Sequence, residues 1–336
     1  MTQGAARILA ALRAAGDVPL SGESLSGVLD VSRAQIWKHV EALRAAGYHI
    51  EGEPGGGYRL TGAPDRLYAE EVQPRLATRW LARRYLWLDD TDSTNRVAAD
   101  LAREGAEHGT TVVAESQSAG RGRLGRSFFS PPYLNLYTSI VLRPNLDTAR
   151  APTTILAAAI AVAETVAATV DDPEAVELKW PNDVLLGGLK TSGILMEMGA
   201  EATRVRHLVL GIGVNLNVDR ARFPDEFRSL ATSLASHRGR PVDRVDFAAR
   251  LYDNLEAVLD RHAQGGFEAV RMDFEARFQM RGRRVRVLDA LGGGGAAVEG
   301  AATGIDADGA LLVLRDDGTT ERVVAGDVTI AKEKVR

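Results

Sequence analysis

A loop rich in glycine and arginine, followed by two prolines, limits the folds that this chain can adopt. The loop Gly120–Arg126 follows a strand-like stretch at 111–114 and contains the spacing G-x-G-x-x-G, which is typical of dinucleotide-binding folds and kinases. A dinucleotide-binding loop must open a helix, but Pro131 and Pro132 prevent a helix here. The H-R-D and D-F-G segments of kinases do not occur in the sequence either. Both folds are therefore excluded.

The arginines of this loop indicate an anion-binding site. Arg121, Arg123 and Arg126 stand between glycines such as Gly120 and Gly122, which let backbone and guanidinium groups close on an anion. A triphosphate or an acyl phosphate would fit. The alternative is a solvated arginine loop without a ligand.

A second group of charged residues points to related chemistry. The segment 176–180 alternates apolar and polar residues as a half-buried strand does, and 181–183 turns the chain into another strand. Lys179, Asp183 and Lys190 would then lie close together. Lysines and a carboxylate near arginines can hold a carboxylic acid against an α-phosphate, with Mg²⁺ neutralising the pyrophosphate that leaves. The alternative is an ordinary surface turn whose tryptophan anchors the core.

Charge and cysteine content exclude several classes of protein. The 336 residues include 41 basic and 45 acidic side chains, a net charge of −4, which argues against non-specific coating of nucleic acid or anionic membranes. Without cysteine there is no disulfide, thiolate zinc site or cysteine nucleophile. The start lacks a secretion signal, and Glu164 interrupts the apolar stretch 155–170. We therefore expect a cytoplasmic protein that does not span a membrane.

The first 64 residues have the pattern of a winged helix-turn-helix domain. Ser32 can cap a helix, and Gln35 three residues later completes a capping box. Three helices followed by a hairpin form this DNA-binding fold. The apolar spacing predicts helices at 5–15, 23–29 and 33–46, and strands at 48–50 and 58–60 joined by a turn at 54–57.

The remaining chain is predicted to form two more domains of an α+β protein. From 65 to 278, helical and strand patterns alternate around an apolar helix at 152–170. From 279 to 336, short apolar strands alternate with hairpin turns at 306–309 and 317–318, which indicates a small β-barrel. The predicted domains are therefore 1–64, 65–278 and 279–336.

Six motifs occur together, in an order and at a spacing that are typical of one protein family. The sequence resembles the bifunctional biotin protein ligases that also repress biotin operons, and the match covers almost the whole chain. The motifs are Asp92-Ser93-Thr94-Asn95, Gln117 with Gly120–Arg126, Ser130-Pro131 with Asn135-Leu136-Tyr137, Lys179–Asp183, Lys190 with Gly193-Ile194-Leu195, and Gly211-Ile212-Gly213-Val214-Asn215.

The resemblance implies a fold and assigns roles to residues. It implies a central mixed sheet like that of class II synthetases and an SH3-like C-terminal barrel. Lys190 corresponds to the lysine that bridges the biotin carboxylate and the α-phosphate, Arg123 stabilises charge, and Asp183 is a candidate Mg²⁺ or acceptor-orienting carboxylate. These three are the predicted catalytic residues. The predicted substrate-binding residues are Ser93, Thr94, Asn95, Gln117, Gly120, Arg121, Gly122, Arg123, Arg126, Lys190 and Asn215.

Three positions depart from the family pattern. Phe128 stands where many relatives carry tryptophan, Tyr133 where glycine is common, and Thr191-Ser192 where an apolar pair is usual. These changes could alter the adenine pocket or the ordering of the loop. We expect the chemistry to be retained.

The implied activity is the ATP-dependent formation of biotinyl-AMP and the transfer of biotin to a lysine of a biotin carboxyl carrier protein. Two alternatives stay open: a DNA-binding regulator that senses biotin without ligating it, and a lipoate-type ligase, which shares the fold and chemistry. Lys190 and the intact arginine loop favour an enzyme, because a sensor needs no carboxylate-activating lysine.

The resemblance also implies repression of biotin genes by binding operator DNA. Arg33, Trp37 and Lys38 point away from the apolar side of the third predicted helix. Residues 1–62 hold six basic and six acidic side chains, so one domain alone would bind DNA weakly and a homodimer on two half-sites is expected. The alternative is a winged helix kept for packing or protein contacts. The predicted DNA-contact residues are Ser21, Ser32, Arg33, Gln35, Trp37 and Lys38.

Overall fold

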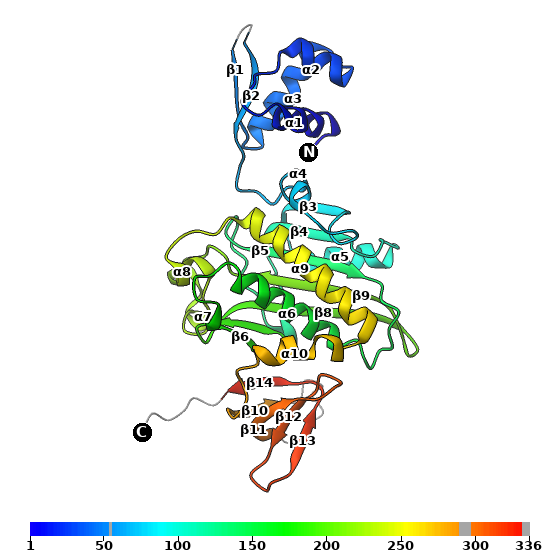
Figure 1. Ribbon diagram of the computed structural model, residues 1–336, viewed down its shortest axis with the longest axis vertical. Coiled ribbons are helices and arrows are strands. Elements are labelled where there is room, and N and C mark those ends of the chain that lie inside the picture. Colours follow the sequence, from blue (N-terminus) through cyan, green and yellow to red (C-terminus); the bar gives the residue numbers. More distant parts are fainter. Residues whose placement is uncertain (54–55, 289–296, 331–336) are drawn as a thin grey trace. The chain divides into compact units, whose positions relative to one another are not determined.

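The computed structural model describes residues 1–53, 56–288 and 297–330 (Figure 1). The chain forms two compact units, Met1–Arg66 and Leu67–Arg336. The second unit contains the predicted C-terminal domain and all of the predicted central domain except residues 65 and 66. The boundaries at 64/65 and 278/279 remain predictions. Among the described residues, no helix is both long and apolar enough to cross a membrane.

The first unit has three helices and a hairpin, as the sequence predicts. Ser32 accepts the Gln35 amide, and the Gln35 side chain accepts the Ser32 amide, so the predicted capping box is present. Ile36, Val40 and Leu43 are buried. The predicted turn at 54–57 lies partly outside the described residues. The elements are α1 (Gln3–Ala15), α2 (Gly22–Leu29), α3 (Arg33–Ala45) and the antiparallel strands β1 (His49–Glu53) and β2 (Gly57–Gly62).

The second unit is built on a mixed sheet of seven strands in the order β3-β4-β5-β9-β8-β7-β6. Only the β3–β4 pair is parallel; the other neighbouring strands are antiparallel. The strands are β3 (Tyr85–Thr91), β4 (Thr111–Gln117), β5 (Leu136–Leu142), β6 (Val176–Lys179), β7 (Asp183–Leu186), β8 (Leu189–Glu201) and β9 (Arg204–Val214).

Helices cover both faces of this sheet. Val113, Ile140 and Leu210 point to the large core under α6 and α9, whereas the neighbouring residues Val112 and Val141 point to a smaller core under α5, because side chains alternate along a strand. Figure 1 shows α6 and α9 lying across one face. The helices are α4 (Ala69–Val72), α5 (Thr94–Arg103), α6 (Thr153–Ala167), α7 (Asp225–Arg228), α8 (Leu234–Arg238), α9 (Arg244–Gly265) and α10 (Glu268–Ala276).

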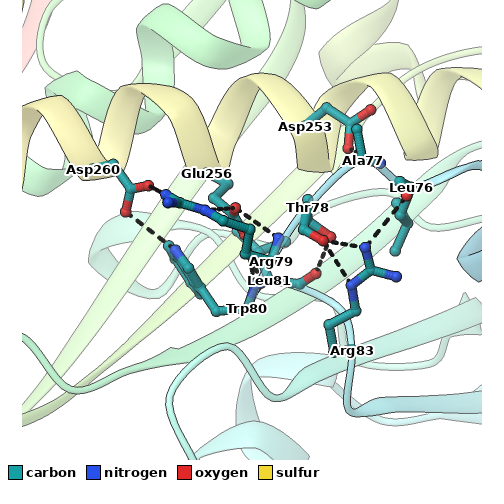
Figure 2. Close-up of polar contacts among 10 residues, drawn as sticks. All are labelled: Leu76, Ala77, Thr78, Arg79, Trp80, Leu81, Arg83, Asp253, Glu256 and Asp260. Carbon is teal, nitrogen blue, oxygen red and sulfur yellow. Dashed lines mark hydrogen bonds and ion pairs between the residues drawn. The ribbon is translucent and has the colours of Figure 1, made fainter.

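Carboxylates on α9 hold the segment 76–83 against the helix (Figure 2). Glu256 accepts the backbone amides of residues 79–81 at 2.8, 2.9 and 2.9 Å. Asp253 accepts the amide of residue 77 at 2.9 Å, and Asp260 accepts the indole N–H of residue 80 at 3.1 Å. Three acidic side chains on one helix therefore accept hydrogen bonds from the N–H groups of this loop. The loop leads into β3.

A buried ion pair joins β4 to the start of α9. Arg244 Nη1 lies 2.8 Å from Glu115 Oε2, and neither side chain is exposed. The other oxygen of Glu115 accepts the Leu67 amide at 2.8 Å and the Trp87 indole at 3.2 Å. A buried carboxylate is stable only when paired and hydrogen-bonded in this way. Because Glu115 lies two residues before Gln117, this network also fixes the strand that carries a predicted site residue.

The C-terminal part is a five-stranded antiparallel sheet in the order β13-β12-β11-β10-β14. Val285, Val287 and Val313 share one core with the central sheet, and the Trp180 indole donates to Gly309 O at 2.9 Å. A small β-domain is confirmed, while its SH3-like form stays a prediction. Its strands are β10 (Arg284–Leu288), β11 (Val298–Ile305), β12 (Leu311–Leu314), β13 (Thr320–Val323) and β14 (Asp327–Ile330).

Candidate active site

The loop of glycines and arginines connects β4 and β5 and closes on itself. The Gly122 amide donates to Arg126 O at 2.7 Å, and the Phe128 amide donates to Gly120 O at 2.8 Å. Leu124 has φ +55°, a left-handed conformation that marks a tight turn. Residues 127–135, all described, lead to β5 without a helix. The exclusion of a dinucleotide-binding fold therefore holds.

A first pocket, with about 470 Å³ of empty space, lies between this loop, α5 and strands β8 and β9. Most predicted substrate-binding residues line it; Gly120, Arg126 and Asn215 do not. Gly120 instead lies against Phe128 and Ser130, where a Cβ atom would come within 2.5 Å of Phe128 O. The predicted residues in the lining are Ser93, Thr94, Asn95, Gln117, Arg121, Gly122, Arg123 and Lys190.

Polar side chains from α5 and β4 form a connected group at one end of the first pocket. Gln117 Oε1 accepts the Thr94 amide at 2.9 Å and lies 3.1 Å from its hydroxyl, and Gln117 Nε2 donates to Ser130 Oγ at 3.0 Å. The Ser139 hydroxyl lies 2.8 Å from Thr94 Oγ1 and 2.7 Å from Asn95 Oδ1. Ser93 occupies the N-cap position of α5, yet its side chain makes no capping bond. Its hydroxyl is therefore not committed to the cap.

Glycines on β8 and β9 form the floor of this pocket. A Cβ atom at Gly193 would lie 3.0 Å from Lys190 Nζ, and one at Gly213 would lie 2.6 Å from the Phe128 ring. A Cβ atom at Gly211 would overlap Asn95. Gly193 and Gly213 are also direct partners across the two strands. Side chains at these positions would fill the pocket, which explains why glycine interrupts otherwise apolar strands.

A second, larger pocket with about 1780 Å³ of empty space adjoins the first at the arginine loop. Its apolar wall contains Phe129, Phe223, Phe227 and Leu230, and its charged wall includes cations from the loop and from β6. Arg126, Asp183 and Asn215 lie in its lining. The two pockets share five residues: Gly122, Arg123, Phe128, Asn182 and Lys190.

Positive charge is concentrated where the two pockets meet. Lys190 Nζ lies 2.7 Å from Asp183 Oδ1, and Arg123 Nη1 donates to Asn182 Oδ1 at 3.0 Å. Burial lowers the pKa of Arg123 from its ordinary value, while the nearby Asp183 opposes this change. An arginine stays charged under such a shift. The structure therefore brings the predicted catalytic residues Lys190, Arg123 and Asp183 together.

Asp183 is the predicted metal-binding carboxylate, and it lies in the lining of the second pocket. Its Oδ1 is buried and has no hydrogen bond to any described residue; the contact with Lys190 is an ion pair without hydrogen-bond alignment. Within 1–53, 56–288 and 297–330, three histidine, cysteine, aspartate or glutamate side chains nowhere gather as a metal site. A single carboxylate fits Mg²⁺ only when substrate phosphates complete the coordination.

Of Asn215 and the three departures from the family pattern, Asn215 lines the second pocket and Phe128 lines both pockets, whereas Tyr133 and Thr191-Ser192 line neither. Asn215 is buried and donates to Thr232 O at 3.2 Å, while the Ser192 hydroxyl donates to Gly213 O at 2.7 Å. Phe128 stands over the glycine floor and packs edge-on against Tyr137. Tyr133 has φ +62°, a conformation that glycine adopts more easily, which agrees with the expectation of glycine at this position.

Sequence reasoning missed two partners of the predicted residues. Glu197 on β8 lies 2.9 Å from Arg121 Nη1 and accepts from Asn95 Nδ2 at 3.2 Å. Asn182 holds Arg123 from the turn between β6 and β7. Glu197 contacts two residues that line the first pocket, and nothing in the local sequence indicates these partners.

The predicted DNA-contact residues lie on α2 and α3 of the first unit. Ser21 and Ser32 cap these helices, and Gln35 belongs to the capping box. Arg33 lies 2.9 Å from Glu23 in an exposed ion pair. Trp37 is 55% exposed, and Lys38 is exposed on the same helix. An exposed tryptophan on a helix of this fold is available for contact with a partner.

Comparisons with known proteins agree with this architecture. Residues 87–215 match the model of the Biotin/lipoate A/B protein ligase family, residues 5–59 match an HTH domain, and residues 282–330 match the Biotin protein ligase C terminal domain. The Bifunctional ligase/repressor BirA of Bacillus subtilis is 35% identical over 94% of this chain and 95% of its own length. The protein of the same name from Escherichia coli is 33% identical over 92% of each.

A solved structure shares the fold of about three quarters of this chain. The biotin protein ligase from Aquifex aeolicus, in complex with biotin and ATP, has a TM-score of 0.63 and 27% identity over 74% of this chain and all of that chain. With three matching domains and relatives above 30% identity over nearly their full length, this chain belongs to the family of bifunctional ligase/repressor proteins named BirA.

Proposed function

We propose that this protein activates biotin with ATP and transfers it to a lysine of a biotin carboxyl carrier protein. The observation that carries this proposal is the pair of pockets that meet at Lys190 and Arg123. Such an arrangement brings two substrates into contact at one point under positive charge. Adenylation needs that geometry and needs no nucleophile from the enzyme.

The lining of each pocket suits one substrate. The first pocket offers hydroxyl and amide groups from Thr94, Asn95 and Gln117 beside a glycine floor, which suits a flat ureido ring that both donates and accepts hydrogen bonds. The second pocket offers aromatic and aliphatic side chains such as Phe223 and Leu230 beside arginines, which suits an adenine base and its phosphates. The carboxylate of biotin and the α-phosphate of ATP would therefore meet where the two pockets join.

The reaction that we propose has two steps. A carboxylate oxygen of biotin attacks the α-phosphorus, and the bond from that phosphorus to pyrophosphate breaks, giving biotinyl-AMP. The amine of the carrier lysine then attacks the acyl carbon, AMP leaves, and the amine loses a proton. Lys190 and Arg123 bring the two anionic groups together and stabilise the charge that develops. The loop Gly120–Arg126 would shield the mixed anhydride from water.

Asp183 would hold Mg²⁺ together with the phosphates of ATP. Its Oδ1 is buried, has no aligned hydrogen bond within the described residues and contacts the Lys190 ammonium in an ion pair. A carboxylate in this position fits the usual arrangement, in which one or two carboxylates and several phosphate oxygens bind this ion. When bound, the ion neutralises the leaving pyrophosphate. Asp183 also keeps Lys190 in place through their ion pair.

The first unit would bind operator DNA of biotin genes, in the cytoplasm, as part of a homodimer. The exposed helix face with Arg33, Trp37 and Lys38 supplies the contacts. Its charge is balanced over residues 1–62, so tight binding needs two such units on two half-sites. Biotinyl-AMP in the second unit would be the corepressor.

An ATP–pyrophosphate exchange assay tests the ligase activity. We expect exchange that depends on biotin and not on lipoate, and a decrease of about 100-fold or more in Lys190→Ala, because a charge-stabilising group is lost. Lys38→Ala, the same change on the first unit, is the matched control and should exchange like wild type. Absence of exchange in wild type would favour the regulator that senses biotin without ligating it. Exchange with lipoate alone would favour the lipoate-type ligase.

A further inference from the structure

We propose that Asp327, on β14 of the C-terminal domain, is a positioning residue that holds the arginine loop for the nucleotide. This inference rests on the proposed function of the site and adds a residue from outside the central domain. Asp327 pairs with Arg126, and the preceding residue, Gly326, holds Arg123. The C-terminal domain would thereby help to bind the triphosphate of ATP.

The contacts come from two neighbouring residues at the start of β14. Arg126 donates from Nη1 to Asp327 Oδ1 at 3.3 Å and from Nη2 to Oδ2 in a closer contact. Arg123 Nη2 donates to Gly326 O at 3.2 Å. The two guanidinium groups are thus held by one short segment that lies 201 and 203 residues away in sequence. Two-point contacts between arginine and a carboxylate fix direction as well as distance.

The segment that makes these contacts is itself held firmly. Asp327 pairs with Leu288 across β10, and the next residue, Val328, is buried in the core. A Cβ atom at Gly326 would lie 2.9 Å from Leu288 O and would overlap Val287. The backbone that presents the carboxylate and the carbonyl therefore has little freedom, and it can act as a fixed support for a loop.

The arginine loop needs such supports because it concentrates like charges. Arg121 is held by Glu197 on β8, and Arg126 is held by Asp327 on β14. Arg123 is held by Asn182 in the turn after β6 as well as by Gly326. The charge of Asp327 also opposes the effect of burial on the pKa of Arg123. If one of the partner carboxylates is removed, the repulsion between the three guanidinium groups is less well compensated.

The position of Asp327 predicts which substrate would be affected. Asp327, Val328 and Thr329 line the second pocket, and none of them lines the first. The polar group that we assign to biotin is instead formed by α5, β4 and β5. A change at Asp327 should therefore weaken the binding of ATP and leave the binding of biotin nearly unchanged.

Steady-state exchange kinetics of the full chain carrying Asp327→Asn test this inference. We expect KM for ATP to rise about three- to tenfold, with KM for biotin within about twofold of wild type. Asp316→Asn is the matched control: Asp316 also pairs with an arginine of the C-terminal domain, Arg284, at 2.7 and 2.8 Å, but on an exposed surface. It should leave both KM values unchanged.

A double variant separates positioning from a general loss of structure. If Asp327 acts through Arg126, Asp327→Asn should change KM for ATP by less than about twofold in an Arg126→Gln background. Equal increases of both KM values, a lower KM for ATP, or fully additive effects would each overturn the inference. If wild type shows no biotin-dependent exchange, the proposed function fails instead, which is a different result from normal exchange with an unaffected Asp327→Asn.

Discussion

His262 lies on the buried side of α9, and its Nε2 is 2.7 Å from the Thr153 hydroxyl. Burial lowers its pKa from 6.5 to about 4, and the charge of Arg150 acts in the same direction. The imidazole is therefore neutral in the folded protein at neutral pH. Its contact with Thr153 links the start of α6 to the C-terminal end of α9. This imidazole is a structural group that lines neither pocket.

Protonation of His262 is expected to make the protein less stable in mild acid. The unfolded chain binds this proton near pH 6.5 and the folded protein only near pH 4, so the free energy of unfolding is unaffected above pH 6.5 and falls below it. The loss is about 1.4 kcal/mol per pH unit, or about 2 kcal/mol at pH 5. Urea unfolding at pH 7.5 and pH 5 should show this loss in wild type and a smaller one in His262→Gln. Equal losses in the two proteins would disprove the assignment.

At the scale of elements, side chains on one helix satisfy the backbone of a distant loop. Three acids on α9 accept donors from the segment 76–83, with Glu256 at the centre (Figure 2). Burial alone would raise the pKa of Glu256, but the three amide hydrogen bonds outweigh burial and hold the pKa below its ordinary value. The ionised carboxylate is thus part of the link between α9 and the strand that follows the loop.

Glu256→Gln should destabilise the protein by about 2 kcal/mol at pH 7. The amide group keeps one acceptor oxygen and turns a donor toward loop amides that need an acceptor. Urea unfolding measures the change, and Asp246→Asn on the same helix is the control, because its exposed pair with Arg250 contributes less than about 1 kcal/mol. The lowered pKa of Glu256 means that its contribution is present above pH 4.5 and lost below it. The difference between wild type and the variant should therefore shrink in acid.

At the scale of the whole molecule, two activities lie in two units of one chain. The pockets belong entirely to Leu67–Arg336, and the exposed helix face belongs to Met1–Arg66. The proposed ligase activity should therefore be insensitive to changes on that helix face. DNA binding should depend on both units if biotinyl-AMP in the second unit is the corepressor, as we propose.

Trp37→Ala separates these two activities. In a gel shift with operator DNA, biotin and ATP, we expect affinity to fall about tenfold, since an exposed aromatic contact is lost. Biotin-dependent exchange should remain at the wild-type rate. Val18→Ala, which also truncates an exposed apolar side chain of the first unit, is the control and should bind like wild type. Unchanged DNA binding in Trp37→Ala would favour a winged helix that serves packing or protein contacts.

The sequence alone determined the features that depend on neighbouring residues. The capping box at Ser32, the buried faces of α1 and α3, the absence of a helix after the arginine loop and the motif residues of the first pocket were all predictable. Helix periods, caps and proline restrictions act over a few residues, so local sequence is sufficient for them.

Only the tertiary structure decided which distant residues meet. Asp327 reaches Arg126 across 201 positions, Glu115 reaches Arg244 across 129, and Asn95 reaches Glu197 across 102. Such pairs depend on strand order and on the packing of whole elements, which no local pattern encodes. The arginine loop itself was evident in the sequence. The folded chain supplied the partners that hold its arginines, two carboxylates and one amide from three separate elements.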